Sequence, residues 1–192
     1  MWSQLTRPSL LARLRDGHDE LAWREFDQRY RDLIVRYARQ SGLQPADAED
    51  VRQVVMMNLA RAMPGFQYDP GRGRFRGYLG RVVRNAVRRH QRGQGARFLE
   101  LGHDLAEASG MADPIWDREW MLHHYRRAMG TVRRGFEARS VSVFDRILAG
   151  DPVQEVATDF DLTVQAVHKV KQRIRRRLQD LVARQVAEED GL

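Results

Sequence analysis

The apolar residues of this chain recur at intervals of three and four positions, which is the period of one face of an α-helix. The pattern is clearest between residues 22 and 62, where two such faces follow one another: Ala22, Phe26, Tyr30, Leu33 and Tyr37, then Val51, Val55, Leu59 and Ala62. No segment shows a convincing alternation of apolar and polar residues, as a half-buried strand would. The sequence therefore predicts an all-α fold.

Breaks in this periodicity divide the 192-residue chain into two small helical domains. Residues 1–92 form the first domain. Residues 93–113 carry four glycines among mixed residues, and we interpret them as a flexible linker. Periodicity then resumes, so we expect a second domain over residues 114–187 and a short tail over residues 188–192.

Composition excludes several classes of function. The chain has no cysteine, which rules out disulfides, cysteine-ligated zinc, iron–sulfur clusters and thiol catalysis. No apolar run approaches the roughly 18 residues of a membrane span, and the N-terminus lacks the hydrophobic region of a secretory signal. We therefore expect a cytoplasmic protein that is not inserted in a membrane.

The positive charge is concentrated in two segments. The formal net charge of the chain is +7, from 33 Lys and Arg residues against 26 Asp and Glu residues. Residues 71–97 contain nine arginines and no acidic residue, and residues 163–184 have a net charge of +6. The remainder of the chain has a net charge of −8. A basic excess held in two places is typical of a protein that binds nucleic acid.

Two short apolar patterns near the C-terminus have the spacing of a helix-turn-helix. The first helix is expected over residues 153–160, and the second follows Thr163, which is suited to cap it. Ala157 lies where the two helices cross closely and a small side chain is needed. Asp161 occupies the turn position where glycine is usual, and aspartate tolerates a positive φ better than most residues.

The outward face of the second helix carries polar and basic side chains that suit the reading of duplex DNA: Gln165, His168, Lys169, Gln172, Arg173 and Arg176. Glutamine and arginine can form paired hydrogen bonds with the edges of adenine and guanine. The N-terminal half of such a helix reads bases, and its distal arginines hold phosphates. An ordinary helical hairpin with a solvated basic face is the alternative interpretation.

The first basic segment suits contact with a single strand, because residues 71–78 mix arginine, glycine and aromatic side chains. Phe66 and Tyr68 just upstream offer faces on which bases can stack, although Phe66 could instead seat the loop. A stronger electrostatic feature is the run of arginines that follows: Arg81, Arg84, Arg88, Arg89 and Arg92.

Nothing in the sequence indicates an enzyme. Asp47, Glu49 and Asp50 lie in the first turn of a helix, where acidic residues are expected because they complement the helix dipole. His123 and His124 point to different helix faces and lack the spacing of paired metal ligands. The chain has no Walker loop, nucleophile elbow or zinc signature, so we expect no catalytic residue, no metal site and no cofactor.

Four short motifs, in order, resemble the promoter-melting domain of the extracytoplasmic-function (ECF) sigma factors of bacterial RNA polymerase. They are the segments 22–26, 47–53, 75–79 and 83–85, which read AWREF, DAEDVRQ, FRGYL and VRN. Residues 154–181 resemble the C-terminal helix-turn-helix domain of the same family. The chain has room for these two sigma domains only, which favours the ECF class.

The resemblance implies a role for each group of residues. Asp47, Asp50 and Gln53 would dock on the clamp helices of the largest polymerase subunit. The C-terminal helix would read the minus-thirty-five element as duplex, and the linker would thread through the polymerase toward the RNA exit path. The non-template strand of the minus-ten element would be bound, with one base extruded, by Phe66, Tyr68, Arg72, Arg74, Asn85, Arg88 and Arg89.

The implied partners are bacterial RNA polymerase core and promoter DNA. Many ECF sigma factors are also held by an anti-sigma factor, although no residue here identifies one. A stand-alone helix-turn-helix regulator is the alternative, which would bind a palindromic duplex as a dimer and ignore the polymerase. A third interpretation, an RNA-binding protein or a nucleic-acid-processing enzyme that uses residues 71–92, lacks a credible carboxylate or metal constellation.

Overall fold

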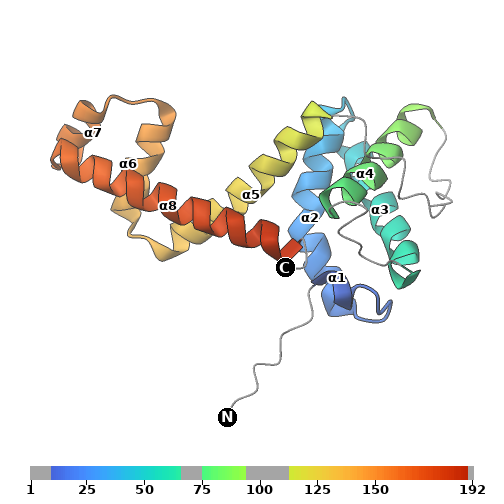
Figure 1. The fold of residues 1–192 in the computed structure, drawn as a ribbon. Helices are drawn as coiled ribbons and strands as arrows, with labels where there is room; N and C mark the ends of the chain where they lie inside the picture. The colour runs from blue at the N-terminus through green and yellow to red at the C-terminus, as the bar shows by residue number, and fades with distance from the viewer. Residues whose placement is uncertain (1–9, 66–74, 94–112, 190–192) are drawn as a thin grey trace, which may run out of the picture. The chain divides into compact units, whose positions relative to one another are not determined.

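The computed structural model describes residues 10–65, 75–93 and 113–189. Every regular element in these ranges is a helix, so the prediction of an all-α fold is confirmed (Figure 1). The chain divides into two compact units. Unit 1 consists of Met1–Met121 together with Ala187–Leu192, and unit 2 consists of Leu122–Val186.

Most of unit 1 is built from α1 (Leu10–Arg13), α2 (Glu20–Gln40), α3 (Pro45–Ala62) and α4 (Phe75–Gln91), with a 3-10 turn, η1 (Met63–Gly65), after α3. The start of α2 is capped by Asp19, whose side chain accepts a 2.9 Å hydrogen bond from the amide of Ala22. α3 begins with a proline, whose fixed φ suits a first turn. α2, α3 and α4 pack against one another (Figure 1).

The core of unit 1 is rich in aromatic rings. The ring centroids of Phe26 and Tyr30 on α2 lie 4.6 Å apart, and Phe75 of α4 lies 6.1 Å from Phe26. These rings are buried together with aliphatic residues of the three helices, among them Leu33, Val55, Leu59 and Leu79. The apolar faces that the helical period predicts are therefore the faces that form this core.

α5 (Pro114–Gly135) is one continuous helix that contributes to both units. Trp116 and Trp120 lie about one turn apart in its first part, and both belong to the buried core of unit 1. The sequence pattern predicts that the second domain starts at residue 114, whereas the boundary between the compact units follows Met121. The reason is the large apolar surface of the two indoles, which is buried against the aromatic core of unit 1.

Unit 2 combines the rest of α5 with α6 (Ala138–Ala149), α7 (Val153–Asp159) and most of α8 (Val164–Glu189). α6 starts at Ala138 and is followed by Gly150, which has a φ of 98°. That left-handed conformation favours glycine after a helix. α8 continues through Glu189, so two residues that the sequence assigns to the tail are helical.

Two adjoining apolar clusters form the core of unit 2. One contains Ala128, Met129 and Val132 of α5, Phe144 of α6, and Ile174 and Leu178 of α8. The other joins α6, α7 and the start of α8 through Val143, Val156, Ala157 and Val167. The last residues of α8 lie in unit 1, where the hydroxyl of Tyr30 donates a 2.7 Å hydrogen bond to Glu189 Oε1.

Candidate nucleic-acid interface

α4 carries three of the residues that the sequence assigns to the melted strand. Asn85 and Arg89 are partly exposed and Arg88 is exposed. Because each residue turns the helix by 100°, Asn85 and Arg88 lie on the side of α4 away from the buried face formed by Phe75, Leu79, Val82, Val83 and Ala86. Arg89 lies at the edge of that face, beside Val82. Arg88 also lies in the last turn of α4, where positive charge complements the helix dipole.

The other residues assigned to this strand, Phe66, Tyr68, Arg72 and Arg74, lie outside the described residues. Tyr78 is partly buried and packs against the core, with its ring centroid 6.4 Å from that of Phe75. Burial raises the pKa of Tyr78 to about 12, although the charge of Arg81 acts in the opposite direction. Its hydroxyl is therefore neutral near pH 7.

Arg84, which directly precedes Asn85, binds a carboxylate that the sequence analysis did not connect with it. Arg84 Nε donates a 3.0 Å hydrogen bond to Asp113 Oδ2, and the Tyr37 hydroxyl donates one of 2.7 Å to the same oxygen. The amide of Trp116 donates to Asp113 Oδ1 at 3.1 Å, which caps α5. Burial opposes the ionisation of Asp113, but these hydrogen bonds outweigh it and lower its pKa.

The predicted polymerase-docking residues on α3 have two different environments. Asp47 is partly exposed, and its Oδ1 lies 3.2 Å from Nε2 of His90 on α4. Asp50 and Gln53 are exposed and lie on the same side of α3, nearly one turn apart. Asp50 and Gln53 therefore present the more accessible part of this face.

Ion pairs hold α3 against α2 beside this face. Glu49 accepts hydrogen bonds of 2.8 Å from both Arg31 and Arg52, and Arg52 also pairs with Asp27 at 2.6 Å. The hydrogen bonds from Arg31 and Arg52 lower the pKa of Glu49, so its carboxylate is ionised near pH 7. These pairs orient α3, and Glu49 itself is occupied by this structural role.

The connection between α7 and α8 has the features of a tight turn. Asp161 has a φ of 48°, and it is the one residue other than glycine with a positive φ in the part of the chain that the structure describes. Thr163 Oγ1 accepts a 3.1 Å hydrogen bond from the amide of Ala166, so the predicted cap is confirmed. The carbonyl of the buried Ala157 accepts a 2.8 Å hydrogen bond from the amide of Leu162, which closes the turn.

α8 presents all of the residues predicted to read duplex DNA as exposed side chains: Gln165, His168, Lys169, Gln172, Arg173 and Arg176. They share one side of the helix, and the buried Val167, Ile174 and Leu178 lie on the other. Arg173 has contacts within the protein. Its guanidinium lies 5.2 Å from the centroid of the Phe136 ring and donates a 3.4 Å hydrogen bond to Ser140 Oγ. These contacts orient Arg173 while leaving its residue exposed.

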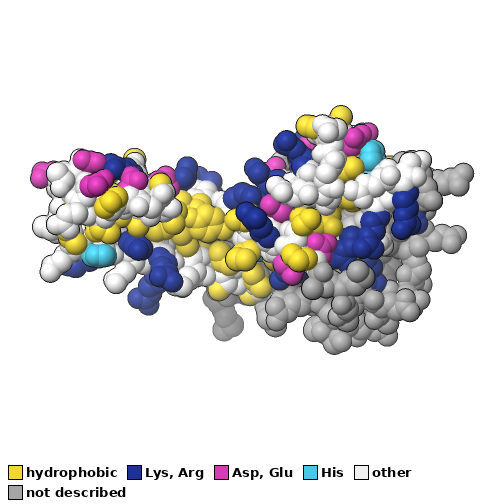
Figure 2. All heavy atoms as spheres, turned by 90° about the horizontal axis from the view of Figure 1, so that it is seen from above, with side chains coloured by type: hydrophobic (Ala, Val, Ile, Leu, Met, Phe, Trp, Pro, Cys, Tyr) yellow, Lys and Arg dark blue, Asp and Glu magenta, His cyan; other side chains and the backbone are white. Residues whose placement is uncertain are grey.

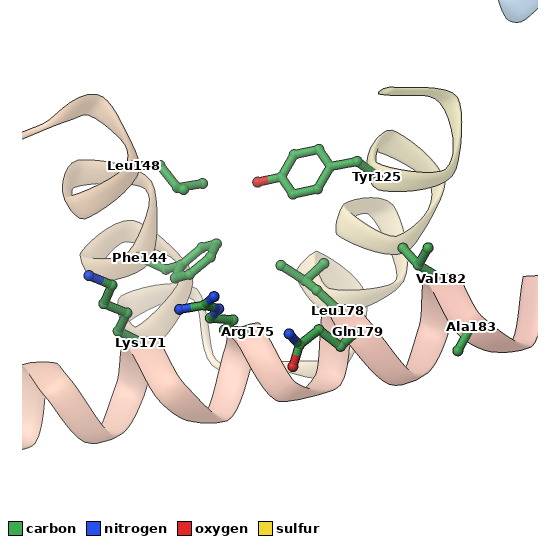
Figure 3. Close-up of a pocket in the computed structure, with 9 residues that line it drawn as sticks. All are labelled: Tyr125, Phe144, Leu148, Lys171, Arg175, Leu178, Gln179, Val182 and Ala183. Carbon is green, nitrogen blue, oxygen red and sulfur yellow. The ribbon is translucent and has the colours of Figure 1, made fainter. Parts of the chain in front are cut away.

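Unit 2 also has an apolar groove of about 600 Å³, lined by α5, α6 and α8. Tyr125 of α5 and Leu148 of α6 point toward each other across it, and Leu178 and Val182 line it from α8 (Figure 3). Figure 2 shows hydrophobic side chains gathered on this unit, with Lys and Arg side chains beside them. None of the residues predicted to bind DNA lines the groove, and no motif in the sequence indicates it.

In the described ranges, no three or more His, Asp or Glu side chains lie together as a metal site would need. Within the same ranges, no helix has the length and apolar character to cross a bilayer.

Comparison with known families identifies the N-terminal helices. Residues 26–97 match the family model Sigma-70 region 2, a range that includes α3, α4 and most of α2. No curated protein matches the chain. Sigma-70 region 2 is a non-enzymatic domain of transcription initiation that binds RNA polymerase core. Residues 26–97 are therefore similar to region 2 of the sigma-70 family of sigma factors.

Proposed function

We propose that this chain is an ECF-type sigma factor that directs RNA polymerase core to promoters in the cytoplasm. The observation that carries the proposal is that the matched range, residues 26–97, contains the exposed side of α4 with Asn85, Arg88 and Arg89. In this proposal, α4 binds the non-template strand of the melted minus-ten element. α8 reads the minus-thirty-five element as duplex.

The side chains on α4 suit a melted strand. Opening DNA costs a few kcal/mol for each unstacked base, so a protein that captures the open strand offsets part of that cost. The amide of Asn85 can pair with a base edge, and Arg88 and Arg89 can hold phosphates. The buried aromatic core beneath α4 gives these side chains a rigid support.

The side chains on α8 suit a major groove. Gln165 and Gln172 can pair with adenine edges, and Lys169 and Arg176 can neutralise phosphates. The capped start of α8 and the tight turn after α7 support a helix-turn-helix arrangement, in which the second helix enters the groove. Several phosphate contacts together should make promoter binding strongly dependent on salt.

The polymerase contact is proposed for α3. Asp50 and Gln53 are exposed there, and Asp47 adjoins them beside His90. An anti-sigma factor would be a further partner of a protein of this class, although no described contact points to one.

The test is gel filtration of the full chain mixed with bacterial RNA polymerase core at moderate and high salt. We expect a stable stoichiometric complex, and Gln53→Ala should weaken it without changing the preferred promoter. Gln28→Ala is a matched control, because Gln28 is exposed on α2, outside the proposed docking face. A chain that ignores the core and instead shifts duplex DNA as a dimer would support the stand-alone regulator and refute the sigma assignment.

A further inference from the structure

The first two turns of α5 belong to unit 1 and bind α2 and α4 of that unit through a shared carboxylate. We call residues 113–121 the α5 head. Asp113 accepts hydrogen bonds from Tyr37 of α2 and Arg84 of α4, and so joins the α5 head to two helices. The side chains of Arg84 and Asp113 are only 18% and 16% exposed, so this ion pair is largely shielded from water. A pair of this kind is screened by salt less than a surface pair.

Two indoles extend the contact along the same surface. The ring centroid of Trp116 lies 5.4 Å from that of Tyr37, in an edge-on arrangement at 81°. A Cβ atom at Gly80 would lie 2.6 Å from Trp116 Nε1, so the indole approaches α4 at a distance that only glycine allows. Trp120 stacks on Tyr30 with 6.3 Å between ring centroids. The α5 head therefore fits a surface formed by α2 and α4.

This surface lies beside the proposed strand-binding side of α4. Arg76, Gly80 and Arg84 follow one another at intervals of four, so they form one stripe along the helix. All three contact the α5 head: Arg76 pairs with Asp117 and lies 5.9 Å from the centroid of Trp120, Gly80 meets Trp116, and Arg84 binds Asp113. Asn85 and Arg88 lie on the adjoining side. The α5 head thus leaves those two residues accessible but occupies Arg84.

We infer that the α5 head is a built-in ligand of α4, and that its Asp113 competes with a nucleic-acid phosphate for Arg84. A carboxylate and a phosphate offer the guanidinium the same kind of charged oxygen acceptor. The inference rests on the proposed function, since it assigns Arg84 to the strand that Asn85, Arg88 and Arg89 bind. A strand that takes Arg84 releases the α5 head, and the bound α5 head lowers the affinity of the free protein for the strand. The two effects are reciprocal, because both follow from one coupling free energy.

The first measurement is hydrogen exchange across residues 113–121 in the full chain, with and without a short single-stranded DNA of random sequence. We expect protected amides in the free protein and faster exchange when DNA is bound. Asp113→Asn should also speed exchange in this segment, because asparagine keeps an acceptor for the Trp116 amide but removes the charge that holds Arg84. Tyr37→Phe, which removes one donor only, should produce the same change to a smaller extent.

The second measurement is the binding of the same fluorescently labelled DNA as a function of salt. Freeing one arginine for one phosphate should steepen the slope of log K against log salt by about 0.7. A change of this size in the slope corresponds to about fivefold tighter DNA binding than that of the unaltered protein at about 0.1 M salt. Asp113→Asn should show this gain, and the gain should vanish when Arg84→Ala is added. Asp32→Asn makes the same charge change at an exposed position of α2 and should leave the slope unchanged.

Three results would overturn the inference. The first is that Asp113→Asn raises the affinity for DNA equally whether residue 84 is arginine or alanine. The second is that hydrogen exchange in the α5 head does not change when DNA is added. The third is that no variant binds DNA. None of these outcomes bears on the complex with polymerase core, so the proposed function is tested independently of this inference. Loss of the polymerase complex with the competition intact would refute the sigma assignment and keep Arg84 as a nucleic-acid ligand.

Discussion

Replacing Gly80 by alanine tests the close approach of α4 and the α5 head. An ideal Cβ at position 80 would lie 2.6 Å from Nε1 and 2.7 Å from Cε2 of Trp116. Non-bonded atoms of this kind normally stay about 3.5–4.0 Å apart, so one partner must move by roughly 1 Å. Trp116 is 3% exposed and its indole is rigid, so the ring cannot swing aside as a flexible side chain would.

The magnitude follows from two opposing effects. Alanine stabilises the interior of a helix by about 1 kcal/mol relative to glycine, because glycine loses more backbone entropy on folding. Inserting a methyl group into a well-packed core costs about 1–3 kcal/mol in displaced neighbours. Gly80→Ala should therefore destabilise unit 1 by up to about 2 kcal/mol, or leave its stability nearly unchanged at the lower limit of the cost.

Gly77→Ala provides the control. Gly77 lies on the same helix, and a Cβ added there would meet nothing within 4 Å. The gain in helix propensity is common to both variants, so the difference between their free energies of unfolding isolates the overlap with Trp116. We expect that difference to be about 1–3 kcal/mol in favour of Gly77→Ala, measured by urea denaturation followed by circular dichroism. Tryptophan fluorescence should shift to longer wavelength in Gly80→Ala only, because Trp116 moves toward water.

Equal stabilisation of the two alanine variants, with unchanged fluorescence, would refute this reasoning. It would mean that Trp116 does not lie against Gly80, and the docking of the α5 head would lose its main steric support.

Three further predictions concern single residues. Asp161→Val should lower the free energy of unfolding of unit 2 by about 1–2 kcal/mol, because a β-branched residue tolerates the φ of 48° poorly; Asp161→Gly should not, and thermal denaturation compares them. The ultraviolet difference titration between the protein and Tyr78→Phe should show one phenol with a midpoint of about 12. Because the folded-state pKa of Tyr78 is raised, the contribution of its neutral phenol to the free energy of unfolding is complete below about pH 10 and is lost as the pH rises toward about 12. A midpoint near 10 in the difference titration would contradict the burial of Tyr78. Arg173→Ala should weaken binding to the minus-thirty-five duplex by about 1–3 kcal/mol in holoenzyme footprinting, whereas Arg175→Ala, on the groove side of α8, should have little effect.

The helices and their buried faces could be predicted from the amino-acid sequence alone. The period of three and four residues predicted that Phe26, Leu33, Val55 and Leu59 would be buried, because a helix repeats every 3.6 residues whatever it packs against. Helix caps could also be predicted from the sequence, since an N-cap depends only on residues within one helical turn. The cap at Thr163 was predicted for that reason.

The exposed charges on α4 and α8 could also be predicted, because polar side chains avoid the core. Their interpretation as strand and duplex contacts remains a proposal. The residues from Phe66 to Arg74 lie outside the described ranges, so that part of the candidate site stays a prediction from sequence.

Which helix surfaces contact one another could not be predicted from the sequence and is seen only in the folded protein. Asp113 contacts Tyr37 and Arg84, which lie 76 and 29 positions away in the chain, and no local pattern links them. Trp116 and Trp120 are buried in the core of unit 1, and their spacing in the sequence does not indicate which unit they join. The hydrophobic effect is non-directional: its free energy depends on how much apolar area is buried and not on which helix buries it. The choice of partner depends on shape and on paired polar groups, such as the space above Gly80 and the carboxylate of Asp113, and these exist only when the helices are assembled.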